Sequence, residues 1–338
     1  MKTAIIGAGI AGLSAARSLK AAGQDVKLFD KGRGPGGRLS TRRAATELGE
    51  LRWDHGAPFF EAGKGAFRSE LEALAASGAV ASWSPRIADV RRKDAGWTVG
   101  IRPMPARQHL YVGQPTMNAV IKGLAAGLQI DWGRRVSAIS VDGMAKTLAF
   151  EDGTSEGPFD QVFVAVPAEQ AAALLEGVSP QLAEAAAAAK SAPRWVAMLA
   201  FDSAIDVPWD VASIAGSALS MAVRNASKPG RDPGETWVLH ASPDWSREHV
   251  DVPKEEVAAL LAGAFSDLVG AGTPSFVAAH RWLYGEVAKS AGGDFGWDED
   301  TGIGAASDWW LGPSVEAAWT SGAALADSLT GRKLTLEK

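Results

Sequence analysis

Three glycines near the N-terminus have the spacing of a phosphate-binding turn. Gly7, Gly9 and Gly12 form the pattern G-x-G-x-x-G. In such a turn the first glycine permits a tight reversal and the second lets a pyrophosphate approach the backbone. The third lets the following helix pack closely on the strand, so that the helix N-terminus faces the phosphates with free amides. The spacing therefore predicts a dinucleotide site.

The flanking segments have the composition that this turn needs. Residues 3–6 form a short apolar run typical of a buried parallel strand, and residues 26–29 form a second one. Asp30 ends the second run, where an acidic side chain accepts hydrogen bonds from an adenosine ribose. The same N-terminal stretch could instead be an export signal, because Lys2 gives it a basic start and an apolar run follows. Three glycines would weaken the helix of such a signal, so we expect a cytoplasmic protein.

A loop rich in glycine and arginine follows Asp30, with the sequence KGRGPGGRLSTRR. Gly36 and Gly37 followed by Arg38 would bring flexible backbone donors and a guanidinium close to the phosphates. Seen alone, such a stretch would be interpreted as a solvated basic loop, but its position directly behind the glycine turn favours the phosphate role. The arginines could instead receive a 2′-phosphate, which leaves NADP as an alternative cofactor.

Composition limits the classes of function. The chain has 338 residues, of which 46% are hydrophobic and 22% charged, and its net charge is −5. We therefore expect neither a nucleic-acid partner nor a membrane partner, since no apolar run approaches the ~20 residues of a membrane span. The chain contains no cysteine, which excludes disulfides, thiolate catalysis, iron–sulfur clusters and a cysteinyl flavin. The five histidines lack metal-ligand spacing, so no metal site is expected.

Four stretches together resemble the FAD-dependent amine oxidase superfamily. They are GAGIAG with Asp30, the GGR element, VAVP before a helix, and an aspartate-bearing turn before a helix near the C-terminus. Within that superfamily, LFDKGRGPGGRLSTRR, LRWDHGAPFF, HRWLY and SDWWLGPSVEAAWTSG resemble bacterial renalase-like proteins. The resemblance extends over residues 5–325.

The resemblance implies an α/β fold in two domains. A discontinuous Rossmann-type FAD-binding domain, a parallel sheet with helices on both faces, would comprise residues 1–80, 108–175 and 295–338. An inserted substrate domain with a mixed or antiparallel sheet and helices would comprise residues 81–107 and 176–294.

The resemblance also implies non-covalent FAD and the residues that bind it. The glycines of the turn would hold the pyrophosphate, Asp30 the ribose, and Arg38 would lie near the phosphates. Asp308 and the backbone that follows would lie along the ribityl chain and the pyrimidine end of the flavin. The full expected cofactor set is Gly7, Gly9, Ile10, Ala11, Gly12, Asp30, Lys31, Gly37, Arg38, Asp308, Pro313 and Val315. Ser307 stands where a glycine is common, so a Cβ there would shift the backbone if a positive φ were needed.

The resemblance implies a substrate pocket with aromatic walls. Phe59 or Phe60, Trp282 and Trp309 match such walls, with His240 and Arg281 nearby. The implied reaction oxidises isomeric dihydro-NAD(P), a misreduced nicotinamide, to NAD(P)+. A hydride passes to flavin N5, and O2 is then reduced to H2O2.

This chemistry fits the absence of an evident acid–base constellation, because hydride loss from a dihydropyridine yields an aromatic cation without a protein base. The indole faces suit that cation. Most of the 13 tryptophans are nevertheless expected in cores and domain contacts. Oxidation of a small amine is the main alternative, and a flavin- or nucleotide-binding protein without turnover is the second.

Overall fold

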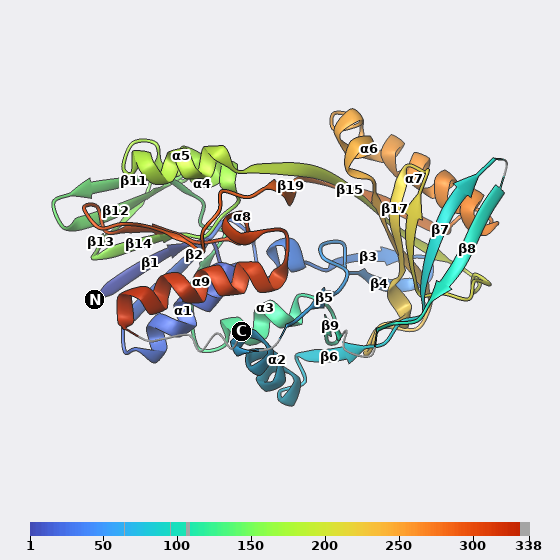
Figure 1. Cartoon of the computed structure of the whole chain (residues 1–338), viewed down its shortest axis with the longest axis horizontal. Helices are drawn as coiled ribbons and strands as arrows, with labels where there is room; N and C mark the ends of the chain where they lie inside the picture. The colour runs from blue at the N-terminus through green and yellow to red at the C-terminus, as the bar shows by residue number, and fades with distance from the viewer. Residues whose placement is uncertain (64, 95, 106–108, 332–338) are drawn as a thin grey trace.

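The computed structural model describes residues 1–63, 65–94, 96–105 and 109–331. Two large sheets form the two halves of the molecule, seen at the left and right of Figure 1. The long antiparallel strands β15 (Lys190–Phe201) and β19 (Phe276–Lys289) run from one half into the other. The site described below lies where the two halves meet.

The first large sheet has the topology of a dinucleotide-binding fold. It has six strands in the order β10-β2-β1-β14-β21-β20, and all neighbours are parallel except β20 and β21. The strands are β1 (Lys2–Ile6), β2 (Asp25–Asp30), β10 (Gln129–Trp132), β14 (Gln161–Val164), β20 (Gly296–Asp298) and β21 (Ile303–Ala305). The expected parallel sheet is confirmed, and its strands come from both ends of the chain.

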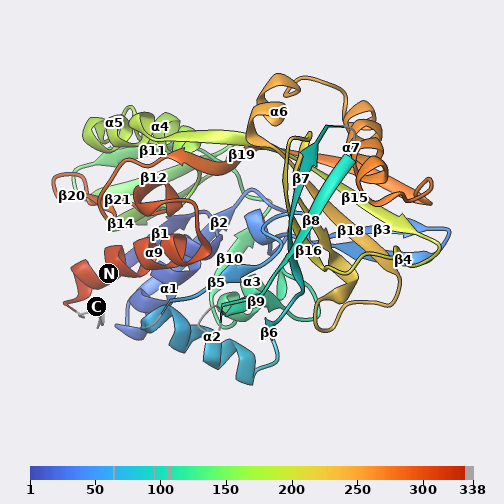
Figure 2. The same ribbon diagram turned by 45° about the vertical axis from the view of Figure 1, so that its right-hand side comes forward.

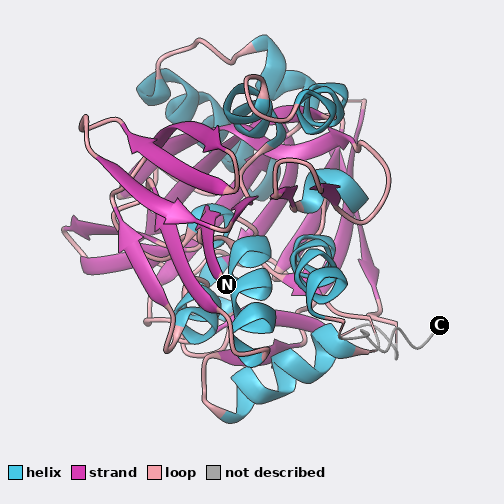
Figure 3. Ribbon diagram, turned by 90° about the vertical axis from the view of Figure 1, so that its left-hand side faces the viewer, coloured by secondary structure: helices cyan, strands magenta, loops and turns pink. Residues whose placement is uncertain are grey.

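Both faces of this sheet are buried, which explains why its strands are continuous apolar runs. Ile5 and Leu28 face α1 (Ile10–Ala21), α3 (Ala119–Ala125) and α9 (Val315–Thr330). Ala4, Ile6 and Phe29 face the opposite core, which contains α4 (Ala168–Leu175) and α5 (Pro180–Ala188). Figure 3 shows helices above and below these strands.

A three-stranded antiparallel sheet completes the second of these cores. Its strands are β11 (Val136–Asp142), β12 (Ala145–Phe150) and β13 (Ser155–Phe159). The hairpin turn at Gly143 has φ +55°, as the Asp-Gly pair in the sequence indicates.

Helices α1 and α9 approach each other so closely that a glycine is required at the crossing. A Cβ added to Gly322 of α9 would lie 2.0 Å from the carbonyl oxygen of Ala11 in α1. At the start of α1, a Cβ added to Gly12 would lie 1.9 Å from the carbonyl oxygen of Gly7 in the glycine turn. The hydroxyl of Ser14 also donates to the carbonyl of Trp319 at 2.8 Å. The first turns of α1 are thereby fixed against the middle of α9.

The second large sheet forms the other half. It has seven strands in the order β19-β15-β18-β17-β16-β7-β8, antiparallel except for the β16–β7 pair. The strands not yet given are β7 (Ile87–Lys93), β8 (Gly96–Arg102), β16 (Val211–Ala215), β17 (Leu219–Arg224) and β18 (Glu235–Ala241). One face packs on α7 (Lys254–Val269), beside α6 (Pro243–Glu248), as Figure 2 shows. The opposite face is turned toward the first half.

Short elements fill the junction between the halves. They are the pair β3 (Arg42–Thr46) and β4 (Gly49–Trp53), the sheet β5 (Phe60–Glu61), β9 (Leu110–Gly113) and β6 (Val80–Trp83), the helices α2 (Ala66–Ala76) and α8 (Asp308–Leu311), and the 3-10 turns η1 (Gly37–Leu39) and η2 (Asn225–Ser227). The domain boundaries inferred from sequence remain a prediction, and the one at 107/108 lies outside the described residues.

The α1–α9 crossing gives a testable prediction. Gly322→Ala should lower the free energy of unfolding by roughly 1–3 kcal/mol, because the new methyl group meets backbone that cannot move aside. Gly263→Ala is the matched control, since Gly263 lies in α7 with no atom within 4 Å of its added Cβ. That control should stabilise the protein by about 0.5–1 kcal/mol. Urea unfolding of both apo variants measures the difference, and equal stabilities would contradict the close contact.

Candidate active site

A cavity of about 600 Å³ lies between the two halves. It opens at the carboxyl ends of β1, β14 and β21, since Gly9, Ala165 and Ser307 follow these strands and line it. Ligands of open parallel sheets bind at this edge. The opposite wall comes from the seven-stranded sheet.

The glycine turn forms one end of the cavity. Gly9, Ile10 and Ala11 line it, whereas Gly7 and Gly12 lie behind them. Gly7 has φ +102°, and a Cβ there would lie 2.5 Å from the carbonyl oxygen of Ala165. A Cβ on Gly9 would meet no atom of another described residue, apart from its two chain neighbours, within 4 Å. The fold therefore requires Gly7 and Gly12, whereas the space beside Gly9 is left for a ligand.

A second helix N-terminus, that of α9, faces the same cavity. Pro313, Ser314 and Val315 line it, and the hydroxyl of Ser314 caps the helix by accepting from the Ala317 amide at 3.0 Å. Ser307 has φ −173°, an extended backbone that any residue adopts. The backbone therefore accepts the serine side chain without moving, although a glycine is common at this position.

Arg38 and Asp308 were both expected near the cofactor, and the structure pairs them with each other. The two guanidinium nitrogens donate to the two carboxylate oxygens at 2.6 and 2.7 Å. Both residues line the cavity, and the Asp308 side chain is only 8% exposed. The pair presents a fixed, nearly neutral polar edge between the two helix N-termini.

Three other residues of the expected cofactor set lie outside the cavity lining. Asp30 accepts hydrogen bonds from the amides of Ala8 and Gly32, both at 2.7 Å, and thereby braces the glycine turn. Lys31 donates to Gln170 at 3.0 Å. Gly37 begins η1 with φ +53°, and its neighbour Gly36 lines the cavity instead. Asp30 as the ribose ligand stays a prediction.

Two of the expected aromatic wall residues do line the cavity. Trp282 and Phe59 are on its wall. The Trp282 indole N–H donates to the carbonyl of His55 at 2.8 Å, and its ring stacks on the His55 ring with centroids 5.3 Å apart. The orientation of this indole is therefore fixed from both its edge and its face.

The other expected wall residues lie elsewhere. Phe60, the first residue of β5, is buried in the core against Phe67 and Tyr111, whereas Phe59, which precedes the strand, lines the cavity. Trp309 is 1% exposed, stacks on Trp310 and donates to the carbonyl of Val166. Arg281 donates to the carbonyl of Val250, because it occupies the face of β19 opposite Trp282.

The far wall of the cavity carries a polar group that the sequence did not reveal. Arg194 of β15 donates to the hydroxyl of Ser220 at 3.1 Å and to the carbonyl of Ala241 at 2.7 Å, and it forms an ion pair with Glu286 at 2.5 Å. His240 lines the same wall. No local motif marks Arg194, since only the β15–β19 pairing places it opposite Trp282.

The histidines around this wall are neutral at ordinary pH. Burial, and then the charge of Arg194, lowers the pKa of His240 to about 3. Burial and the neighbouring His280 lower the pKa of His55 to about 4. Within the described chain, His240 Nε2 is buried without a hydrogen-bond partner. It can therefore donate or accept a hydrogen bond, according to its tautomer.

Neither a metal-binding group nor a membrane-spanning helix is found among the described residues. No group of three or more His, Asp or Glu side chains there is placed to hold a metal ion. No helix of the described part is both long and apolar enough for a membrane span.

Comparison with known proteins identifies the class. Residues 5–72 match an NAD(P)-binding Rossmann-like domain, and residues 75–294 match the flavin containing amine oxidoreductases. The chain belongs to the family of flavin-containing amine oxidoreductases, and it is an FAD-dependent oxidoreductase. The expected cofactor and enzyme class are thereby confirmed.

Solved structures of low sequence identity share the fold. A protein provisionally described as a protoporphyrinogen oxidase from Exiguobacterium sp. 255-15 has a TM-score of 0.78 at 13% identity, with 98% of this chain and 99% of that chain covered. Cyclohexylamine oxidase from Brevibacterium oxydans IH-35A has a TM-score of 0.73 at 13% identity, with 98% of each chain covered. Putrescine oxidase bound to putrescine has a TM-score of 0.68 at 13% identity, with 98% and 100% covered.

The geometry beside Gly9 gives a prediction about the cofactor. Gly9→Val should abolish FAD retention while leaving the fold intact, because its side chain enters space that no protein atom occupies. Flavin content and circular dichroism of the purified protein measure the two effects. Gly7→Val is the contrasting variant and should impair folding itself. Retention of FAD by the Gly9 variant would show that the pyrophosphate lies elsewhere.

The buried histidines predict an acid-sensitive fold. Their folded pKa values lie below the ordinary value of about 6.5, so only the unfolded chain takes up protons as the pH falls from about 6.5 toward 4. Stability should fall in that window, by up to roughly 2 kcal/mol each for His55 and His240 at pH 5. Above pH 6.5 these groups should have no effect.

Urea unfolding at pH 7 and pH 5 tests this account. His240→Gln should weaken the pH dependence by about one proton. An unchanged pH dependence in that variant would show that His240 binds its proton equally well in the folded and unfolded protein.

Proposed function

We propose that the protein oxidises isomeric dihydro-NAD(P), the misreduced nicotinamides, to NAD(P)+. The observation that carries this proposal is the charge pairing around the cavity. Among the described residues, the two carboxylates that line the cavity are both paired with arginines, Glu286 on the far wall and Asp308 on the cofactor side. The wall also carries the neutral His240. An ammonium group would have to break one of these pairs, whereas a neutral dihydropyridine would not.

In this proposal one end of the cavity holds FAD and the other holds the substrate ring. The glycine turn, the N-terminus of α9 and the Arg38–Asp308 pair would hold FAD, because helix N-termini and a flexible glycine backbone suit its diphosphate. The remaining part, between Trp282, Phe59 and the far wall, would hold the substrate ring. When bound, FAD supplies the hydride acceptor at N5, and O2 with a solvent proton reoxidises it to give H2O2.

The residues of the chain would bind and orient the substrate ring. A nicotinamide carboxamide offers both a carbonyl oxygen and an amide N–H, so it can pair with His240 Nε2 in either tautomer. Pairing would remove the cost of leaving that nitrogen unpartnered. The Trp282 face would stabilise the cationic product by about 0.5–2 kcal/mol. Loss of hydride makes the ring aromatic, so no side chain has to accept a proton.

Amine oxidation is the second candidate function. Cyclohexylamine oxidase and putrescine oxidase share the fold, and the family is that of amine oxidoreductases. On this alternative Glu286 would leave Arg194 and bind the ammonium group. Binding of flavin without turnover is the third candidate.

One experiment separates these candidates. The holoenzyme is mixed anaerobically with 2-, 4- and 6-dihydro-NAD(P) and with cyclohexylamine and putrescine, and flavin bleaching is followed. The proposal predicts fast bleaching by a 2- or 6-dihydro isomer and slow bleaching by the amines. Bleaching by amines alone would establish the second candidate, and bleaching by none would favour the third.

A variant of the aromatic wall sharpens this prediction. Trp282→Ala should slow flavin reduction by roughly 2- to 30-fold, the equivalent of the cation–π energy, while FAD stays bound. Trp245→Ala is the matched control, because Trp245 stacks on His249 outside this cavity. An unchanged rate in the Trp282 variant would assign that indole to packing alone.

A further inference from the structure

The segment from Trp53 to Ala57 contacts both halves of the molecule, and its last two residues, Gly56 and Ala57, line the cavity. The Trp53 indole donates to the carbonyl of Leu199 at 2.8 Å, in β15 of the seven-stranded sheet. The carbonyl of His55 accepts from Trp282. The Ala57 amide donates to the carbonyl of Arg38 at 2.8 Å. This short segment therefore contacts both the expected cofactor side and the expected substrate side.

Gly56 makes the contact with Arg38 especially close. A Cβ added to Gly56 would lie 2.1 Å from the Arg38 carbonyl oxygen and 2.7 Å from its carbonyl carbon. A small displacement of the turn would therefore displace the Arg38 backbone. Arg38 in turn holds Asp308 through two hydrogen bonds. The position of the turn is thus transmitted to the polar edge of the cavity.

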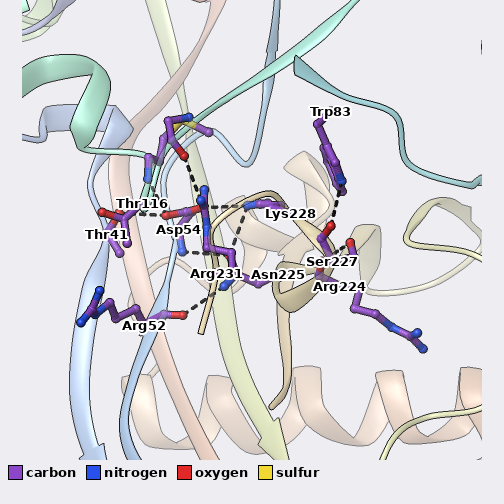
Figure 4. Close-up of polar contacts among 12 residues, drawn as sticks. Thr41, Arg52, Asp54, Trp83, Thr116, Arg224, Asn225, Ser227, Lys228 and Arg231 are labelled. Carbon is purple, nitrogen blue, oxygen red and sulfur yellow. Dashed lines mark hydrogen bonds and ion pairs between the residues drawn. The ribbon is translucent and has the colours of Figure 1, made fainter. Parts of the chain in front are cut away.

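A buried ionic cluster holds this turn from behind (Figure 4). Lys228 donates to the Asp54 carboxylate at 3.0 Å, and Arg231 donates to it at 2.6 and 3.1 Å. The amide of Met117 and the hydroxyl of Thr41 donate to its other oxygen at 2.9 and 2.8 Å. The side chains of Asp54, Lys228 and Arg231 are at most 2% exposed.

The cluster is charged at neutral pH. Burial alone would raise the pKa of Asp54, but Lys228, Arg231 and the Met117 amide outweigh it, so the pKa lies well below its usual range. Burial lowers the pKa of Lys228 to about 8, against the attraction of Asp54. Asn225 completes the cluster by accepting from Lys228 at 3.2 Å and donating to the carbonyl of Arg52 at 3.0 Å.

We propose that Asp54 is a positioning residue for the active site. Through its ionic cluster it fixes the turn at residues 54–57, and through that turn it aligns Arg38 with the cofactor and Trp282 with the substrate. Lys228 and Arg231 come from the loop between β17 and β18, so the cluster also sets how the seven-stranded sheet meets the cofactor half. Removing one partner of a buried ion pair leaves an uncompensated buried charge, so each member of the cluster holds the others in place.

The test compares Asp54→Asn with Asp210→Asn. Asp210 is the matched control, because it also accepts a bidentate ion pair, from Arg86 at 2.9 and 3.1 Å. The cavity lining includes no chain neighbour of Asp210, whereas Gly56 and Ala57, which follow Asp54, both line it. For Asp54→Asn we expect the FAD dissociation constant to rise at least ~10-fold and the absorption envelope of bound FAD to change. For Asp210→Asn we expect a lower melting temperature with unchanged FAD affinity and spectrum.

Two more variants keep the test decisive if Asp54→Asn does not fold. Asp54→Asn with Lys228→Met keeps the net charge of the cluster and should recover folding but not FAD affinity. Thr41→Val removes one hydrogen bond to Asp54 and should weaken FAD binding by a smaller factor. Wild-type FAD affinity and spectrum in these variants would overturn the proposal. This proposal rests on the FAD site of the proposed function but not on its substrate. Because FAD affinity is measured without substrate, the result can be interpreted even if the dihydronicotinamide proposal fails.

Discussion

The contact of α1 with α9 is the constraint on which the rest of the structure depends. At Ala11 and Gly322 the backbones of the two helices are in contact, so only glycine fits at position 322. The contact joins the beginning of the chain to its end. Both helices follow parallel strands of one sheet, β1 and β21, so their N-termini lie at the same edge. There their unpaired amides can receive one extended anionic ligand. The cofactor half of the cavity is a consequence of that contact.

The substrate half depends on a different kind of interaction. The seven-stranded sheet is fixed against the cofactor half by polar contacts with the segment from Trp53 to Ala57. Because these contacts include a buried ionic cluster, they fix the orientation of the seven-stranded sheet relative to the cofactor half. The cavity consequently has a polar edge at Arg38 and Asp308 and an aromatic wall at Trp282. On its far wall the charges of Arg194 and Glu286 cancel each other.

The local parts of this structure could be predicted from the sequence because they depend on local chemistry. The glycine turn follows from the spacing of Gly7, Gly9 and Gly12, and the strands β1 and β2 follow from the apolar runs on either side of it. The resemblance to the FAD-dependent amine oxidases extended this to Arg38 and Asp308, although not to their pairing with each other.

The substrate wall could not be predicted in the same way, because strand register decides it. Phe59 and Phe60 are neighbours in sequence but face opposite sides, and so do Arg281 and Trp282. Arg194 reaches the cavity only through its pairing with β19. Trp309 adjoins the expected flavin segment, yet its indole packs into the core. A pattern in one sequence identifies the strand but not which of two adjacent side chains meets the ligand.

The claim that a dihydropyridine gives up a hydride in this cavity is tested most directly by isotopic substitution. Dihydro-NAD isomers carrying deuterium on the reduced ring carbon are mixed with the holoenzyme under anaerobic conditions in a stopped-flow spectrometer. The account predicts slower flavin bleaching than with the unlabelled isomer, and NAD+ as the product. Equal rates for labelled and unlabelled substrate in the bleaching step, or bleaching only by an amine, would contradict it.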